Sequence, residues 1–155
     1  METGNSLFSM VRLKELAVKM IEIGDSPLYA FKMMFYADFY AFKSLKRSIT
    51  GSPYIRLDYG PVPDNFRALL ASLKRDGRVV EKSGHTWTVN KKADMSLFDD
   101  EEKRVIEDIV SLVKKHGKSK VLELSHEEDA FKKTSPFHAV DYKLAATLKY
   151  PKAKR

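Results

Sequence analysis

One apolar segment, residues 26–46, restricts the fold of this chain more than any other feature. Asp25 or Ser26 is the expected N-cap residue, and Pro27 stands at the first helical position, where its fixed φ suits a helix start. The side chains that follow are apolar nearly all the way round a helix, and such a helix is buried on most sides. The sequence therefore predicts a helix from Ser26 to Lys46 at the centre of the core. Its apolar members are Leu28, Tyr29, Phe31, Met33, Met34, Phe35, Tyr36, Phe39, Tyr40, Phe42 and Leu45.

Length and composition predict one domain around this helix. The chain has 155 residues, of which 43% are hydrophobic and 32% charged, as is usual for a folded domain. We assign residues 1–148 to that domain and residues 149–155 to a basic, frayed tail. The absence of Cys excludes disulfides, thiolate metal sites and a thiol nucleophile, and it favours the cytoplasm. No apolar stretch reaches the roughly 18 residues of a membrane span, so no membrane contact is expected.

Further helices are predicted on both sides of the central one. Apolar residues at three- and four-residue steps indicate a helix over residues 6–23, ended by Gly24. Asp64 is the expected N-cap of a helix that runs to residue 76. Asp99 and Glu102 form a capping box for a helix that ends at Gly117. A short helix over 119–124 follows, and residues 125–128 repeat the capping-box pattern.

The strands are predicted to be short. Residues 54–59 alternate between apolar and polar side chains, which indicates a strand, whereas the prolines of residues 60–63 argue against a regular ladder. Residues 78–82 and 86–90 bracket a turn at 83–85 and predict a β-hairpin. The expected fold class is α+β and mainly helical, with the central apolar helix surrounded by helices and a small antiparallel sheet or hairpin on one side.

Two charged residues interrupt the apolar helix. Lys32 and Asp38 lie six residues apart, which places them about 240° from each other round the helix, so they do not pair directly. Buried charges need partners. We therefore expect each of the two to bond a residue of another element, as part of a polar core that orients the strand or the loop at residues 59–63.

The known motifs for nucleotide, metal and nucleophile chemistry are missing. The seven glycines stand singly, which excludes both glycine-rich phosphate-binding patterns. His126 stands beside carboxylates, but the second histidine of a zinc helix is absent, because position 130 is Ala. No GxSxG motif marks a serine nucleophile. The sequence thus predicts no catalytic residue, no metal and no cofactor.

The charge pattern leaves a DNA-binding alternative open. The formal net charge is +7, from 28 Lys and Arg against 21 Asp and Glu, and it favours anionic partners. The predicted order of helices, strand and hairpin over residues 6–90 also suits a winged-helix transcriptional regulator. In that case Arg67, Lys74 and Arg75 would face the DNA.

Four segments together resemble the Panacea domain, also called the SocA-like antitoxin domain. They are residues 32–39 (KMMFYADF), 47–51 (RSITG), 59–63 (YGPVP) and 124–128 (LSHEE), and the similarity extends over about residues 28–131. The chain departs from the usual pattern in the KMMFYAD run, where two methionines and a phenylalanine replace a Leu-rich sequence. It departs again at Phe131, where the family commonly has Trp.

The resemblance implies a non-enzymatic antitoxin of a toxin-antitoxin pair, of bacterial, archaeal or prophage origin. Such domains neutralise a cognate toxin by direct protein binding, and a SocA-type member also delivers its toxin to a cytosolic protease. The implied partners are therefore a toxin protein and, for an adaptor role, a protease.

Two segments are candidates for binding the partner. Aromatic and Arg side chains on a rigid support lose little entropy when they bind, which favours the strand and the proline-containing loop. The SHEE segment supplies a second, acidic patch. Both segments have an alternative role as folding determinants, in setting the turn and in capping a helix. The candidate residues are Tyr54, Arg56, Tyr59, Pro61, Val62 and Pro63 in the first segment, and His126, Glu127, Glu128 and Phe131 in the second.

Overall fold

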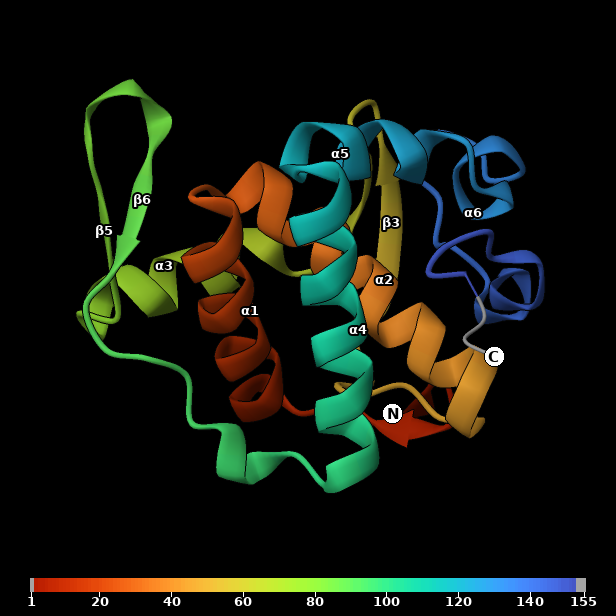
Figure 1. Cartoon of the computed structure of the whole chain (residues 1–155), viewed down its shortest axis with the longest axis horizontal. Helices are drawn as coiled ribbons and strands as arrows, with labels where there is room; N and C mark the ends of the chain where they lie inside the picture. Colours follow the sequence, from red (N-terminus) through yellow and green to blue (C-terminus); the bar gives the residue numbers. More distant parts are fainter. Residues whose placement is uncertain (1, 153–155) are drawn as a thin grey trace.

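A computed structural model describes residues 2–152 and shows a mainly helical α+β fold, as the sequence predicts (Figure 1). Three short 3-10 helices accompany the main elements: η1 (Ser83–His85), η2 (Met95–Leu97) and η3 (Tyr142–Thr147). The other elements are β1 (Glu2–Thr3), β2 (Ser6–Leu7), α1 (Met10–Gly24), α2 (Pro27–Leu45), β3 (Tyr54–Leu57), β4 (Gly60–Pro63), α3 (Phe66–Arg75), β5 (Val79–Glu81), β6 (Trp87–Val89), α4 (Asp100–His116), α5 (Lys118–His126) and α6 (Asp129–Lys132).

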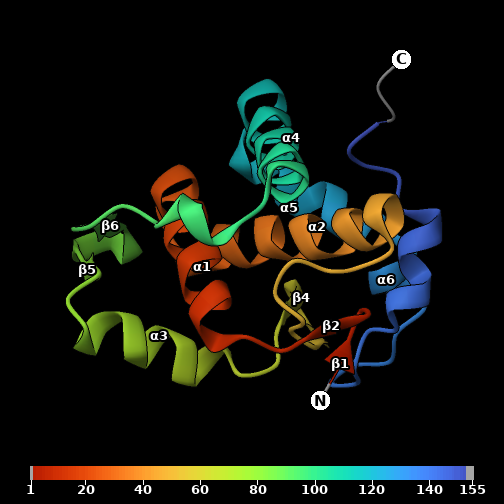
Figure 2. The same cartoon turned by 90° about the horizontal axis from the view of Figure 1, so that it is seen from below.

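Helix α2 lies at the centre, as its apolar sequence predicts. It contacts α1, α4, α5, β4 and η3. Figure 2 shows it crossing the middle of the molecule, with α4 on one side and β4 on the other. Its start agrees with the sequence, because the Ser26 hydroxyl accepts a hydrogen bond from the Tyr29 amide and Pro27 is the first helical residue.

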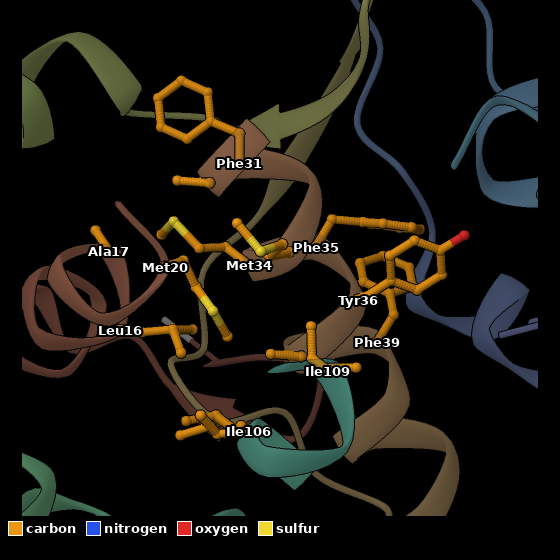
Figure 3. Packing of buried hydrophobic residues seen from close by; sticks show 14 of the residues in the cluster. Leu16, Ala17, Met20, Phe31, Met34, Phe35, Tyr36, Phe39, Ile106 and Ile109 are labelled. Atoms are coloured by element: carbon orange, nitrogen blue, oxygen red, sulfur yellow. The ribbon is translucent and has the colours of Figure 1, made fainter. Parts of the chain in front are cut away.

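The core forms where α1 and α4 pack on α2. Figure 3 shows Leu16 and Met20 of α1, Met34 of α2 and Ile106 and Ile109 of α4 directed toward one another. On the opposite side of α2, aromatic rings fill the space. Phe39 stacks on Tyr142 of η3 with 4.2 Å between ring centroids, which brings the C-terminal part of the fold onto the central helix.

The ends of α4 and α1 are fixed by polar contacts. Asp99 and Glu102 form the predicted capping box, and Gly117 ends the helix. Glu102 also binds Arg12 of α1 and Arg47, the latter at 2.7 Å, so that one buried carboxylate joins three segments. A capping residue on α4 thus also fixes the position of α1.

Helix α1 begins later than the sequence predicts. Residues 6 and 7 pair with β1 instead of starting the helix, and Ser9 is the N-cap, because its hydroxyl accepts a hydrogen bond from the Arg12 amide. The predicted end is confirmed. Gly24 is the last helical residue, and Asp25 behind it takes a left-handed φ of 62°.

The YGPVP segment forms a strand, contrary to the prediction. β4 pairs antiparallel with β3, with Arg56 opposite Pro61 and Tyr54 opposite Pro63. The main-chain bonds of Tyr54 and Arg56 point the other way, toward residues 137–140. Tyr54 and Arg56 therefore need no hydrogen bond from the residues opposite them on β4. Pro61 and Pro63 can occupy those positions although proline has no amide N–H to donate.

Two further expectations need correction. Asp64 does not cap α3, because Asn65 is the N-cap and makes no side-chain cap bond. β3 pairs with β4, whereas β5 pairs with β6 in a separate sheet, so the strand before α3 and the hairpin after it do not combine. The predicted hairpin is present, but the sheet of a winged-helix arrangement is not formed by the described residues.

Candidate partner-binding site

The β3–β4 hairpin is attached to α2 through a buried lysine. The Lys32 side chain is fully buried, and its amine donates a hydrogen bond of 2.9 Å to the main-chain carbonyl of Pro61. Burial lowers the pKa of Lys32 to about 7, because the charged amine loses its hydration. This amine therefore holds β4 against the central helix.

Asp38 fixes the opposite end of the hairpin. Its carboxylate accepts hydrogen bonds from the Ile49 amide (2.8 Å), the Thr50 amide (2.9 Å), the Thr50 hydroxyl (2.6 Å) and the Tyr54 hydroxyl (2.8 Å). Burial raises the pKa of Asp38, and these four bonds oppose that effect by stabilising the charged form. Lys32 and Asp38 thus bond separate elements, in keeping with their angular separation on α2.

Glu128 attaches the SHEE segment to α2 as well. This residue is fully buried, and its carboxylate accepts hydrogen bonds of 2.8 Å from the Tyr36 hydroxyl and from the Lys149 amide. Burial is the main cause that raises the pKa of Glu128. Because Lys149 takes part in this contact, the packed structure continues beyond residue 148, where the sequence places the start of a frayed tail. Residues 153–155 of that tail lie outside the described residues.

The predicted capping box at residues 125–128 is wrong. Ser125 lies inside α5, and its hydroxyl donates to the Leu122 carbonyl at 2.6 Å. Glu128 precedes α6, but its carboxylate turns into the core toward Tyr36 and does not cap the helix. The SHEE segment is a folding determinant through the buried Glu128.

At Gly60 the YGPVP segment packs against residues of the KMMFYADF and LSHEE segments. Gly60 begins β4 with φ of 107°, a conformation that residues with a side chain rarely adopt. A Cβ atom at this position would lie 3.3 Å from the Lys32 Cδ and Cε atoms and 3.3 Å from the Ser125 hydroxyl. A side chain at position 60 would therefore force the Lys32 and Ser125 side chains to shift by a few tenths of an ångström.

We predict that Gly60→Ala lowers the free energy of unfolding by about 1–3 kcal/mol, because it adds backbone strain and a close contact. Urea unfolding followed by circular dichroism measures this change. Gly77→Ala is the matched control, since φ there is 69° but no atom lies within 4 Å of the added Cβ. A loss at Gly60 no larger than the loss at Gly77 would show that the contact with Lys32 and Ser125 is unimportant.

Half of the predicted partner-binding residues are buried. Tyr54 is fully buried and bonded to Asp38, so it does not supply the surface anchor that the sequence suggests. Four others are buried with it, so none of the five presents its side chain to a partner in this structure. They are Pro61, Val62, Pro63 and Glu128. The choice of Tyr54 as an aromatic anchor failed because Asp38 accepts a hydrogen bond from its hydroxyl inside the core.

The other predicted residues reach the surface. Tyr59, at the turn between β3 and β4, is 66% exposed, and Glu127 is exposed as well. Arg56, His126 and Phe131 are half-buried, and the first two both contact the Phe131 ring. The Arg56 guanidinium lies 4.1 Å from the centroid of the Phe131 ring, and the His126 ring lies 4.7 Å from the same ring. The structure thus joins the two predicted segments side by side.

Tyr59 also borders a groove that the sequence did not indicate. The groove has a volume of about 740 Å³ and lies between the turn of β3–β4, the N-terminus of α2 and the tip of the β5–β6 hairpin. We call it the tip groove. No sequence pattern could have identified it, because its walls come from segments far apart in the chain. Its walls include Leu28, Tyr29, Tyr59, His85, Trp87 and Lys118.

Charged and aromatic side chains meet at the rim of the tip groove. The Lys118 amine lies 5.1 Å from the Tyr29 ring centroid and 3.3 Å from the Asp25 carboxylate. Leu28 is exposed, and Trp87 forms a buried wall. The groove thus offers apolar surface with a polar edge, which is the usual composition of a protein-binding site.

Residues 2–152 show neither a metal-binding cluster nor a membrane-spanning helix. No group of three or more His, Asp or Glu residues in this part of the chain is arranged to hold a metal ion. In the same range, no helix combines the length and the apolar character needed to cross a membrane.

A comparison with protein-family models identifies the family of the chain. Neither the curated proteins nor the solved structures contain a significant match to the chain. The family model described as "Antitoxin SocA-like, Panacea domain" matches residues 31–132, which is more than half of the chain. This range contains Lys32, Asp38, the β3–β4 hairpin and the SHEE segment, the residues that assemble into the buried framework described above. The chain therefore belongs to the SocA-like Panacea antitoxin domain family.

Proposed function

We propose that this protein neutralises a toxin protein by binding it directly through the tip groove. The family match supports an antitoxin role. The single observation that carries the mode of action is the exposed Tyr59 at the edge of an aromatic-lined groove, presented on a hairpin that Lys32 and Asp38 fix to the core.

The physical argument concerns the cost of binding. Association is weakened when flexible groups must be ordered, so anchors on a rigid support retain more of their contact energy. Tyr59 follows β3, whose Tyr54 side chain is held by Asp38, and it precedes Gly60, which packs on Lys32. Tyr is also among the residues that contribute most to protein interfaces. A partner can therefore bind Tyr59 without first ordering the hairpin.

The buried charges support binding over catalysis. Lys32, Asp38 and Glu128 are the residues from which an enzyme site would most readily be built, but each is buried and engaged in hydrogen bonds between elements. Their chemistry is used to hold the hairpin and the C-terminal segment on α2. A surface of this kind acts by covering part of another protein.

Co-expression with the products of the adjacent genes tests the proposal. We expect one of these products to arrest growth when expressed alone, and we expect this protein to restore growth and to co-purify with it. If no adjacent product that arrests growth is rescued or bound, the proposed function is wrong.

We predict that Tyr59→Ala weakens binding to that toxin at least tenfold, because it removes an exposed aromatic anchor. The melting temperature should remain within about 2 °C, since the substitution removes little buried area. Leu7→Ala is the control, because Leu7 is 70% exposed and lies on β2, outside the tip groove. Equal binding by the two variants would show that the groove is not the toxin-binding surface.

A further inference from the structure

The outer edge of β3 is covered by a bulged segment. The Arg56 amide donates to the His138 carbonyl (3.0 Å), and the Phe137 amide donates to the Arg56 carbonyl (2.8 Å). Two consecutive residues, Phe137 and His138, thus bond the single residue Arg56, which is the arrangement of a β-bulge. Beyond it, Ile55 forms an isolated antiparallel bridge with Ala139, and the Val140 amide donates to the Tyr54 carbonyl at 2.8 Å. We call residues 137–138 the Phe137 bulge.

Phe137 occupies its position at a conformational cost. Its φ is 66°, in the left-handed region that glycine and asparagine tolerate and that bulky residues avoid. Its side chain is nevertheless 74% exposed, so the ring contributes little to the core. This φ belongs to the third residue of a turn that follows Pro136 and is closed by the His138 amide, which donates to the Ser135 carbonyl at 3.1 Å. The turn requires the backbone conformation but not a large exposed ring, so the Phe side chain points to a role outside folding.

Arg56, opposite this residue, has no anionic partner. Within residues 2–152, its guanidinium forms no ion pair and no hydrogen bond, and its Nε atom is buried without a partner. The stack on Phe131, at 4.1 Å, fixes the orientation of the guanidinium. Lys133, in the neighbouring α6 region, differs because it already binds the Asp129 carboxylate at 3.4 Å. Arg56 is therefore a pre-oriented cation that still lacks an acceptor.

We propose that Phe137 and Arg56 form a second anchor for the toxin, in which Phe137 enters an apolar recess and Arg56 binds an Asp or Glu carboxylate beside that recess. The inference rests on the proposed antitoxin function but uses a surface separate from the tip groove. A planar guanidinium binds a carboxylate through two parallel hydrogen bonds, which adds both affinity and orientation.

The surroundings of Arg56 favour a protein carboxylate over a nucleic-acid phosphate. The exposed Phe137 ring provides apolar contact area that a phosphate backbone does not use. Phosphate chains are bound by groups of cations. Here the segment around Phe131 carries at least as many acidic residues as lysines, and Lys133 is already paired with Asp129 at 3.4 Å, so no group of free cations among the described residues surrounds Arg56.

The first test replaces Phe137 with a residue that fits its backbone. Phe137→Asn should weaken toxin binding at least tenfold while the melting temperature stays unchanged or rises, because Asn accepts a left-handed φ. Lys46→Asn is the matched control, since Lys46 is exposed and also has φ of 66°. The control should leave toxin binding unchanged. The probe is the purified adjacent-gene product that the wild-type protein binds, with Kd measured by calorimetry.

The second test removes the charge at position 56. Arg56→Gln should weaken toxin binding at least tenfold and should reduce the dependence of Kd on salt concentration, because one charge pair is lost. If the wild-type protein and both variants bind the toxin equally, this inference is wrong and the proposed function stands. If the wild-type protein binds no adjacent product, both fail. Unfolding of Phe137→Asn, or loss of duplex-DNA binding in Arg56→Gln with toxin binding intact, would also overturn the inference.

Discussion

Asp38→Ala should lower the free energy of unfolding by about 4 kcal/mol, since it leaves several buried donors without an acceptor. The carboxylate accepts four hydrogen bonds, from the amides of Ile49 and Thr50 and from the hydroxyls of Thr50 and Tyr54. None of these groups reaches water when the acceptor is removed, because Asp38, Thr50 and Tyr54 are fully buried. For a domain of this size, the change corresponds to a fall in melting temperature of about 8–16 °C.

Asp38→Asn is the control that separates hydrogen bonding from charge. The amide oxygen can still accept from the two main-chain amides, and the hydroxyls of Thr50 and Tyr54 can reverse and accept from the new NH₂ group. We therefore expect Asp38→Asn to cost less than half as much as Asp38→Ala in thermal and urea unfolding. If the two variants are equally unstable, the negative charge determines the stability. If both are near wild type, this network does not hold the hairpin.

The sequence predicted the elements whose signals are local. Helix α2 is buried on most sides because it is apolar on most sides, and the box of Asp99 and Glu102 begins α4 where both the pattern and the structure place it. Local patterns failed where a distant contact decided the outcome. The side chain of Glu128 bonds Tyr36 instead of capping α6, and prolines 61 and 63 enter a strand because the opposite residues bond residues 137–140.

The candidate site was harder to predict for the same reason. Tyr54 and Tyr59 both belong to the strand predicted over residues 54–59, yet Asp38 binds Tyr54 in the core and the turn leaves Tyr59 exposed. The tip groove depends on how the β5–β6 hairpin is placed beside α2, which no local pattern encodes. Ser135 and Pro136 signal a turn before Phe137, but no pattern indicates that the Phe137 ring is left exposed beside Arg56.

The stability of the protein should rise between pH 7 and pH 9.5 through Lys32. Burial lowers the pKa of Lys32 in the folded state to about 7, from its usual value of 10.5. In this range the unfolded chain keeps the proton and the folded protein loses it, so raising the pH favours the folded state. Below pH 7 both states are protonated, so the pH dependence ends and the full cost of burying the charged amine remains. Between the folded and unfolded pKa values, each pH unit raises the free energy of unfolding by about 1.4 kcal/mol.

Lys32→Met isolates this effect, because Met fills a similar volume but has no group that titrates. The difference in unfolding free energy between wild type and Lys32→Met should grow in favour of wild type by about 3 kcal/mol from pH 7 to pH 9.5. Urea titrations at four pH values measure it. Burial raises the pKa of Tyr36 and Tyr54, and tyrosines act in the opposite direction above about pH 10, so the series ends before that point.

Lys43→Met controls for the loss of a lysine hydrogen bond. Lys43 is also on α2 and donates to a main-chain carbonyl, that of Leu148 at 2.9 Å, but it is only half-buried. If burial of the charge is the cause, the pH-dependent difference belongs to Lys32→Met alone. A difference that stays flat for Lys32→Met would mean that the folded protein keeps the Lys32 proton, and that water or a structural change solvates the amine beneath β4.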